Sequence, residues 1–295
     1  MIGFDWLMLA EVSFAGLGSG GLYALAGLAF VLIYKATRVV NLAIGEMLMM
    51  GAYFFFAATS SMGWPIWIGI IAAVIGSGIL GAVIERLLIR PMLGEAPISV
   101  FMITVGLSSI LVGTVELIWG ADQLRLPDFM PSDTVLIGEA MVSPKIFYGF
   151  LAAVALIACV LLVFRFWRGG VALRATASDQ AAAYSMGIDV PRVFSLTWVV
   201  AAMVAAIGGI IVGSISSLSP TMGVFGLSVL VVVIVGGLDS VPGALVGGLL
   251  VGLVESWTGT YFGGEFKLLA TFSLLVLILM VRPYGLFGTH EIERL

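Results

Sequence analysis

Long apolar runs occupy most of the chain, and short polar connections separate them. A helix needs about 20 mostly apolar residues to cross a bilayer. Nine runs come close to that length or a little below it. We therefore expect spans at roughly 12–34, 40–60, 65–84, 98–119, 146–164, 193–217, 224–238, 242–257 and 267–281.

Three of these runs leave the number of spans open at eight or nine. The runs 224–238 and 242–257 are short, and the glycine-rich stretch Gly236–Gly243 joins them. They are either two tilted spans or one helix broken at depth around buried backbone. The run 40–60 begins with Asn41 and carries Glu46, so its place in the membrane is open as well.

The composition agrees with a chain that faces lipid. Apolar residues make up 61% of the 295 residues and charged residues only 10%, with a mean hydropathy of +1.19. A soluble domain carries about 25% charged residues. The predicted fold is therefore an all-α, polytopic integral membrane protein, with residues 1–295 forming a single transmembrane domain.

Connections rich in lysine and arginine alternate along the chain with connections poor in them. This alternation predicts which connections lie on the cytoplasmic side of the membrane. The poor side holds Arg125, Lys145 and Lys267. With nine spans, the amino terminus is expected outside and the carboxyl terminus in the cytoplasm. The rich, cytoplasmic side holds Lys35, Arg38, Arg86, Arg90, Arg165, Arg168, Arg174, Arg192, Arg282 and Arg294.

Two connections are longer than the rest. The predicted outer loop, 120–145, is acidic and carries Asp122, Asp128 and Asp133. The predicted cytoplasmic loop, 165–192, has an alanine-rich middle without proline, which predicts one short helix over Ala172–Met186. Gly187 is placed to end that helix in a left-handed turn, and Pro191 prevents it from continuing.

The residues that enzymes use are scarce. There is one cysteine, Cys159, and one histidine, His290, so we expect no metal site and no disulfide within the chain. The phosphate-binding pattern G-x-x-x-x-G-K-[ST], the H-E-x-x-H pattern and the G-x-S-x-G pattern do not occur. We therefore expect no enzyme active site and no cofactor.

Three carboxylates fall within or near the predicted spans. A charge at the bilayer centre costs about 2.5–3.5 kcal/mol on insertion scales, so each should face the protein interior, a polar path or the membrane surface. Glu46 is the candidate for a polar translocation path, and the alternative is that it fixes local packing. Asn41 lies on another helical face, so either a polar path or a residue on another helix must satisfy Glu46. Glu116 and Glu255 either line the path or reach water near helix ends.

Small residues recur at a spacing of four, which suits close helix packing. The interface is either static or one that moves during function. The pairs are Gly16/Gly20/Ala24, Gly209/Gly213, Gly243/Gly247 and Gly248/Gly252.

Four stretches, in order along nearly the whole chain, resemble the membrane permease subunits of ABC importers for branched-chain amino acids, specifically the LivH-like subunit. Leu42, where phenylalanine is usual, and Asp239, in a position where the family often has glycine, depart from the pattern without breaking it. The stretches are Val40–Tyr53, Leu173–Ile188, Gly236–Glu255 and Arg282–Gly288.

The resemblance implies an assembly of two membrane subunits, two cytoplasmic ATPases and a periplasmic substrate-binding protein in a bacterial inner membrane. It identifies residues 172–187 as a coupling helix that docks on an ATPase, with ATP hydrolysis carried out by that separate chain. We expect the outer-loop aspartates to contact the binding protein and Asn41 and Glu46 to belong to the translocation path. The expected coupling residues are Arg174, Asp179, Gln180, Ala182 and Gly187.

Other functions stay open on the sequence alone. Related permeases carry urea, short amides or aromatic acids, and the second permease subunit is either an identical or a related chain. A secondary transporter driven by an ion gradient would need ion ligands within the membrane, for which Glu46 is the one suggestion. A structural membrane scaffold is the third alternative.

Overall fold

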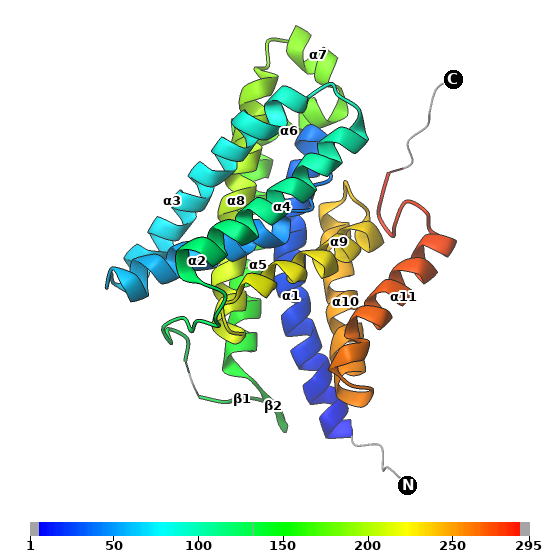
Figure 1. Cartoon of the computed structure of the whole chain (residues 1–295). Coiled ribbons are helices and arrows are strands. Elements are labelled where there is room, and N and C mark those ends of the chain that lie inside the picture. The colour runs from blue at the N-terminus through cyan, green and yellow to red at the C-terminus, as the bar shows by residue number, and fades with distance from the viewer. Residues whose placement is uncertain (1–5, 132, 290–295) are drawn as a thin grey trace. The chain divides into compact units, whose positions relative to one another are not determined.

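A computed structural model describes residues 6–131 and 133–289, and it is almost entirely helical (Figure 1). The terminal residues 1–5 and 290–295, with His290 and Arg294, lie outside the described residues. Within the described part, seven helices are long and apolar enough to cross a membrane. They are α1 (Trp6–Thr37), α3 with its final turns (Ile66–Met92), α4 (Pro97–Trp119), α5 (Pro144–Phe166), α8 (Val190–Ile215), α10 (Val241–Tyr261) and α11 with the turn before it (Gly264–Val281).

Two further apolar helices are shorter. Helix α2 (Ile44–Phe56) continues as a π-turn over Ala57–Ser61, and α9 (Phe225–Gly236) follows a 3₁₀ turn over Pro220–Val224. Seven full spans and two short apolar helices therefore stand where eight or nine spans were expected. The all-α, polytopic membrane fold is confirmed. The run expected at 242–257 is a full-length helix, whereas α9 is the short partner.

The remaining elements lie in the two long connections. The loop 120–145 carries a small hairpin in which β1 (Val135–Ile137) pairs antiparallel with β2 (Ala140–Val142). The loop after α5 carries α6 (Arg168–Ser178) and α7 (Gln180–Ser185).

The contacts between residues divide the chain into two compact units, and each is interleaved in sequence with the other. One unit, called here the terminal unit, comprises 1–27, 129–154 and 228–295. The other, the central unit, comprises 28–128 and 155–227. Whether they form one domain stays a prediction.

The central unit is built around α2, which is buried along almost its whole length. Glycines allow the neighbouring helices to approach closely: a Cβ on Gly51 would collide with Ala206 of α8. Likewise, a Cβ on Gly81 of α3 would lie 2.6 Å from the carbonyl oxygen of Trp198. Figure 1 shows α3 and α8 running alongside each other in this unit. Helices α2, α3 and α8 therefore form a tight bundle with backbone-to-backbone contacts.

The terminal unit depends on a glycine-to-glycine crossing of α1 and α10. A Cβ on Gly20 would lie 2.8 Å from the carbonyl oxygen of Gly248, and one on Gly248 would meet Gly20 in return. The backbone of Gly16 faces Gly252 in the same way. The small-residue pairs predicted from the sequence thus meet each other, and the crossing leaves no room for side chains.

The carboxyl-terminal segment docks on the end of α9. The amides of Leu286 and Phe287 donate to the carbonyls of Val235 (2.8 Å) and Gly236 (2.9 Å), which end that helix. Thr289 hydrogen-bonds to the carboxylate of Asp239. The tail therefore caps carbonyls that a helix end otherwise leaves unsatisfied. Two of the stretches that carry the family resemblance, Gly236–Glu255 and Arg282–Gly288, meet at this place.

Apolar side chains also form exposed stripes on the spans. On α3 the stripe recurs every four residues and comprises Ile71, Ile75, Ile79 and Val83. A helix of a soluble protein buries such a face, so these stripes are the lipid-contacting surface.

Candidate coupling and translocation sites

The predicted coupling segment is a bent pair of helices and not a single helix. The expectation of one helix over Ala172–Met186 is wrong, because α6 ends at Ser178 and α7 begins at Gln180. Asp179 between them is extended (φ −157°, ψ 111°), and its Oδ1 accepts a hydrogen bond from the amide of Ala182 at 2.9 Å. An aspartate that caps a new helix in this way ends the preceding one. We call residues 168–186, which comprise α6, Asp179, α7 and Met186, the elbow.

Several of the expected coupling residues shape the elbow itself, and their role in coupling stays a prediction. Arg174 donates to the backbone carbonyls of Phe164 and Arg165 at the end of α5. Gly187 has φ +83° and ends α7 in the left-handed turn that the sequence predicted. Asp179 caps α7 through the amide of Ala182, as described above.

The exposed surface of the elbow contains two apolar side chains that the sequence interpretation missed. Tyr184 on α7 is 71% exposed, and Met186, directly after α7, is 82% exposed. Gln180 and Ala182 are exposed on α7 as well. The signal was present in the sequence, since Tyr184 and Met186 are the large apolar residues of the stretch 174–187, in which the other residues are small or polar. Large apolar side chains on a polar connection are typical of a protein interaction site.

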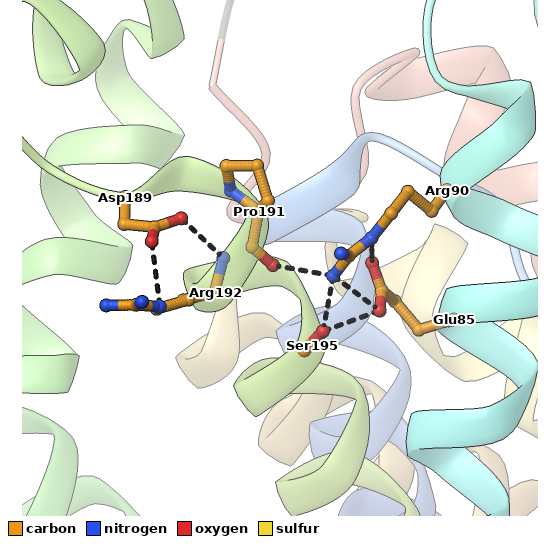
Figure 2. A network of polar contacts seen from close by, with 6 residues as sticks. All are labelled: Glu85, Arg90, Asp189, Pro191, Arg192 and Ser195. Carbon is orange, nitrogen blue, oxygen red and sulfur yellow. Dashed lines mark hydrogen bonds and ion pairs between the residues drawn. The ribbon is translucent and has the colours of Figure 1, made fainter.

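A polar network ties the end of α3 to the start of α8 in the central unit (Figure 2). Glu85 is fully buried, and Arg90 meets both of its carboxylate oxygens at 3.0 Å. The Ser195 hydroxyl donates to Glu85 at 2.6 Å and accepts from Arg90 at 2.7 Å. Arg90 also donates to the carbonyl of Pro191 at 3.2 Å. One arginine therefore holds both a buried carboxylate and the first turns of another helix.

The backbone explains how Glu85 and Arg90 meet. Residues five apart lie on different faces of an α-helix, but α3 ends in a π-turn over Glu85–Ile89. The wider turn, with its i→i+5 hydrogen bonds, brings such residues closer to one face. Among the residues singled out from the sequence, Arg90 is one of the basic residues of a cytoplasmic connection, and Glu85 is absent. The signal that could have found the pair is a carboxylate and an arginine together at the end of an apolar run.

A second ion pair lies beside this network and is far more exposed. Arg192 meets Asp189 at 2.8 Å, with side-chain exposures of 87% and 46%. Asp189 also caps α8 by accepting from the amide of Arg192 at 3.2 Å. Exposed pairs of this kind contribute about 0–1 kcal/mol.

Glu46 lies in the first turn of α2 and faces the protein interior, as the sequence predicted. Its side chain is 8% exposed, and its Oε1 accepts a hydrogen bond from Ser108 of α4 at 2.7 Å. A Cβ on Gly223 would lie 2.7 Å from the same oxygen, so glycine makes room for the carboxylate. Within the described part of the chain, Oε2 has no hydrogen-bond partner. The hydrogen-bond partner of Glu46, Ser108, is therefore on another helix, and the second carboxylate oxygen is available to another group.

Asn41 has a local role at the start of the same helix. Its Oδ1 accepts from the amide of Ala43 at 3.0 Å, and its Nδ2 lies 3.3 Å from the sulfur of Met47. The side chain is fully buried and makes no hydrogen bond with Glu46. This geometry fixes the turn into α2, and the assignment of Asn41 to a translocation path stays a prediction.

Glu255 lies in a cage of hydroxyl groups in the terminal unit. Tyr23 of α1 donates to its Oε2 at 2.5 Å, while Ser228 of α9 and Thr271 of α11 donate to Oε1 at 3.0 and 2.8 Å. Glu255 therefore lies in the protein interior and does not reach water near a helix end, and a place in the translocation path stays a prediction. Glu116, by contrast, is exposed near the end of α4.

The outer-loop aspartates are all exposed, and they belong to different units. Asp122 and Asp128 are in the central unit and Asp133 is in the terminal unit. Among the described residues, no group of histidine, cysteine, aspartate and glutamate has the arrangement needed to hold a metal ion.

The family of the chain follows from comparison with known proteins. A family model described as the permease component of branched-chain amino acid transport systems matches residues 12–281. The chain belongs to this family.

Two relatives show how far the similarity to other permeases of this family extends. The chain is 31% identical to the high-affinity branched-chain amino acid transport system permease protein LivH of Salmonella typhimurium, over 98% of this chain and 99% of that one. It is 28% identical to the corresponding permease protein BraD of Pseudomonas aeruginosa, over 95% of each.

One solved structure shares the fold of this permease. It is PsaBC from Streptococcus pneumoniae in complex with Fab, with a TM-score of 0.52 over 92% of this chain and 91% of that chain. The sequence identity is 13%, so this likeness concerns the fold alone.

Proposed function

We propose that this chain is the membrane-spanning permease subunit of an ATP-driven importer for branched-chain or related amino acids. The observation that carries the proposal is the family match over residues 12–281, which includes nearly every span. The relatives named above are branched-chain amino acid permeases, and their similarity to this chain extends over almost the whole length of each protein. The chain itself acts as a conduit without enzyme activity, and separate ATPase subunits hydrolyse ATP.

The assembly would contain a second permease subunit, two ATPases and a periplasmic substrate-binding protein. The exposed elbow, with Tyr184 and Met186, is the surface we assign to an ATPase. The distribution of lysine and arginine supports a cytoplasmic elbow, with the amino terminus outside and the carboxyl terminus inside a bacterial inner membrane. Under this proposal ATP binding moves the elbow, and the elbow moves the spans.

Purification tests the assembly directly. The affinity-tagged chain, extracted from its native membrane in mild detergent, should elute together with an ATPase and a second permease chain. Elution as a single species, with no ATPase detectable by mass spectrometry, would contradict the proposed function.

We assign Glu46 to the translocation path because one of its carboxylate oxygens has no partner among the described residues. Glu46→Gln keeps the size of the side chain and the bond from Ser108 but removes the charge. We expect normal assembly and about a tenfold loss of uptake, since a charge-assisted hydrogen bond contributes about 1.5–3 kcal/mol. Uptake by reconstituted complexes measures this, with Glu116→Gln on the exposed end of α4 as the control. Failure of the Glu46→Gln complex to assemble would assign the residue to packing instead.

We assign the outer loop to docking of the binding protein. Replacing Asp122, Asp128 and Asp133 together by asparagine should weaken docking most at low ionic strength, because surface charges mainly steer encounter. Uptake measured against binding-protein concentration at low and high salt tests this. Identical uptake curves for the variant and the original protein at every salt concentration would show that these aspartates take no part in docking and that the loop only covers the outer surface.

A further inference from the structure

The elbow is joined to the membrane-spanning part of the central unit by a very short connection. Helix α7 ends at Ser185 and α8 begins at Val190, so only residues 186–189 lie between them. Gly187 turns the chain in a left-handed conformation, and Asp189 caps the first turn of α8. A displacement of α7 therefore displaces the start of α8 as well, because the connection is too short to absorb it.

The first two turns of α8 are in turn held by the end of α3. Arg90 donates to the Pro191 carbonyl and to the Ser195 hydroxyl, at 3.2 and 2.7 Å. The same hydroxyl donates to Glu85 at 2.6 Å (Figure 2). Ser195 is thus the one side chain of α8 drawn in this network that bonds both members of the ion pair, of which Glu85 is buried and Arg90 is 37% exposed.

Burial makes this connection stiff. Glu85 has no exposed surface, so separating it from Arg90 would leave a buried charge without compensation, and separating it from Ser195 would remove one of its hydrogen bonds. Close to the network, the backbone of Gly81 on α3 packs against the Trp198 carbonyl on α8. The ends of α3 and α8 are therefore held together at the place where the elbow is attached.

We propose that Arg90 and Ser195 are positioning residues that transmit movement of the elbow to the α3–α8 pair. This inference rests on the proposed function, because it assumes that ATPase subunits move the elbow. The effect of Arg90 and Ser195 is to convert a displacement of α7 into a joint displacement of two spans, with Glu85 as the buried anchor.

Two conservative variants test the proposal in the complete complex, reconstituted into vesicles with its ATPases and binding protein. Ser195→Ala removes the bridging hydroxyl and leaves the Glu85–Arg90 pair intact. Arg90→Lys keeps the charge and loses the forked geometry that meets both oxygens of Glu85. ATP hydrolysis and solute uptake are measured in the same vesicles. We expect hydrolysis to continue, while the solute moved per ATP falls roughly three- to thirtyfold.

The neighbouring ion pair supplies the matched control. Arg192→Gln removes an exposed pair on the same turn of α8, and the solute moved per ATP should not change. An unchanged ratio in Ser195→Ala and Arg90→Lys, or loss of assembly in both, would overturn the proposal and leave the network a structural role. If the original complex shows no ATP-driven uptake, the proposed function itself fails, which is a distinguishable result.

Discussion

Replacing Tyr184 and Met186 together by alanine is expected to release the ATPase from the permease and abolish uptake. Tyr184 on the short helix α7 is 71% exposed, and Met186, directly after that helix, is 82% exposed. An apolar or aromatic residue central to an interface contributes about 2 kcal/mol or more. Losing two such residues should weaken association at least roughly hundredfold, with little effect on folding, because neither side chain is buried within the chain.

Co-elution of the ATPase with the tagged permease measures this effect, together with uptake by whole cells. Phe262→Ala removes an equally exposed aromatic side chain (75%) from the connection after α10 and serves as the control. A Tyr184→Ala/Met186→Ala double variant that still binds its ATPase would show that the ATPase docks on another surface of the permease.

Adding a single methyl group at Gly252 is expected to disrupt the terminal unit. A Cβ at this position of α10 would collide with the carbonyl oxygen of Gly16 and the backbone of Gly20 on α1. Backbone has no alternative rotamer, so the helices must separate, at a cost of about 1–3 kcal/mol or more. Gly252→Ala should therefore lower the thermal midpoint of the purified complex by several degrees and reduce its yield.

Gly106→Ala is the matched control for that experiment. It places the same methyl group on α4, where no other atom lies within 4 Å of the added carbon. Both variants gain helix propensity, about 1 kcal/mol, so the difference between them isolates the crossing. Equal thermal midpoints for the two variants would show that α1 and α10 do not depend on contact between glycines.

The sequence predicted the features that a bilayer imposes locally. Apolar runs located the spans, because lipid cannot satisfy exposed backbone groups and so selects continuous helices. The spacing of Gly16 and Gly20 on one run, and of Gly248 and Gly252 on another, predicted close packing. Gly187 was predicted as a left-handed helix end, because glycine adopts that conformation without strain.

The features that the sequence did not predict depend on contacts between distant segments, or on competition between two local hydrogen-bonding arrangements of the same residue. Glu85 is buried because Ser195, far along the chain, and Arg90 satisfy its carboxylate. Glu255 is buried because hydroxyls from three other helices surround it, and its place near the end of an apolar run does not reveal these partners. The break at Asp179 reflects a side chain that caps the following helix more favourably than it continues the preceding one.

The measurement that tests the central claim most directly is uptake of radiolabelled leucine into vesicles that contain the complete purified complex. ATP is enclosed on the side of the ATPase subunits, the binding protein is added on the opposite side, and ionophores abolish all ion gradients. The proposed function predicts that uptake needs both ATP and the binding protein and continues when the gradients are gone. Uptake that continues without ATP and stops when an ion gradient is removed would contradict it and identify an ion-coupled carrier.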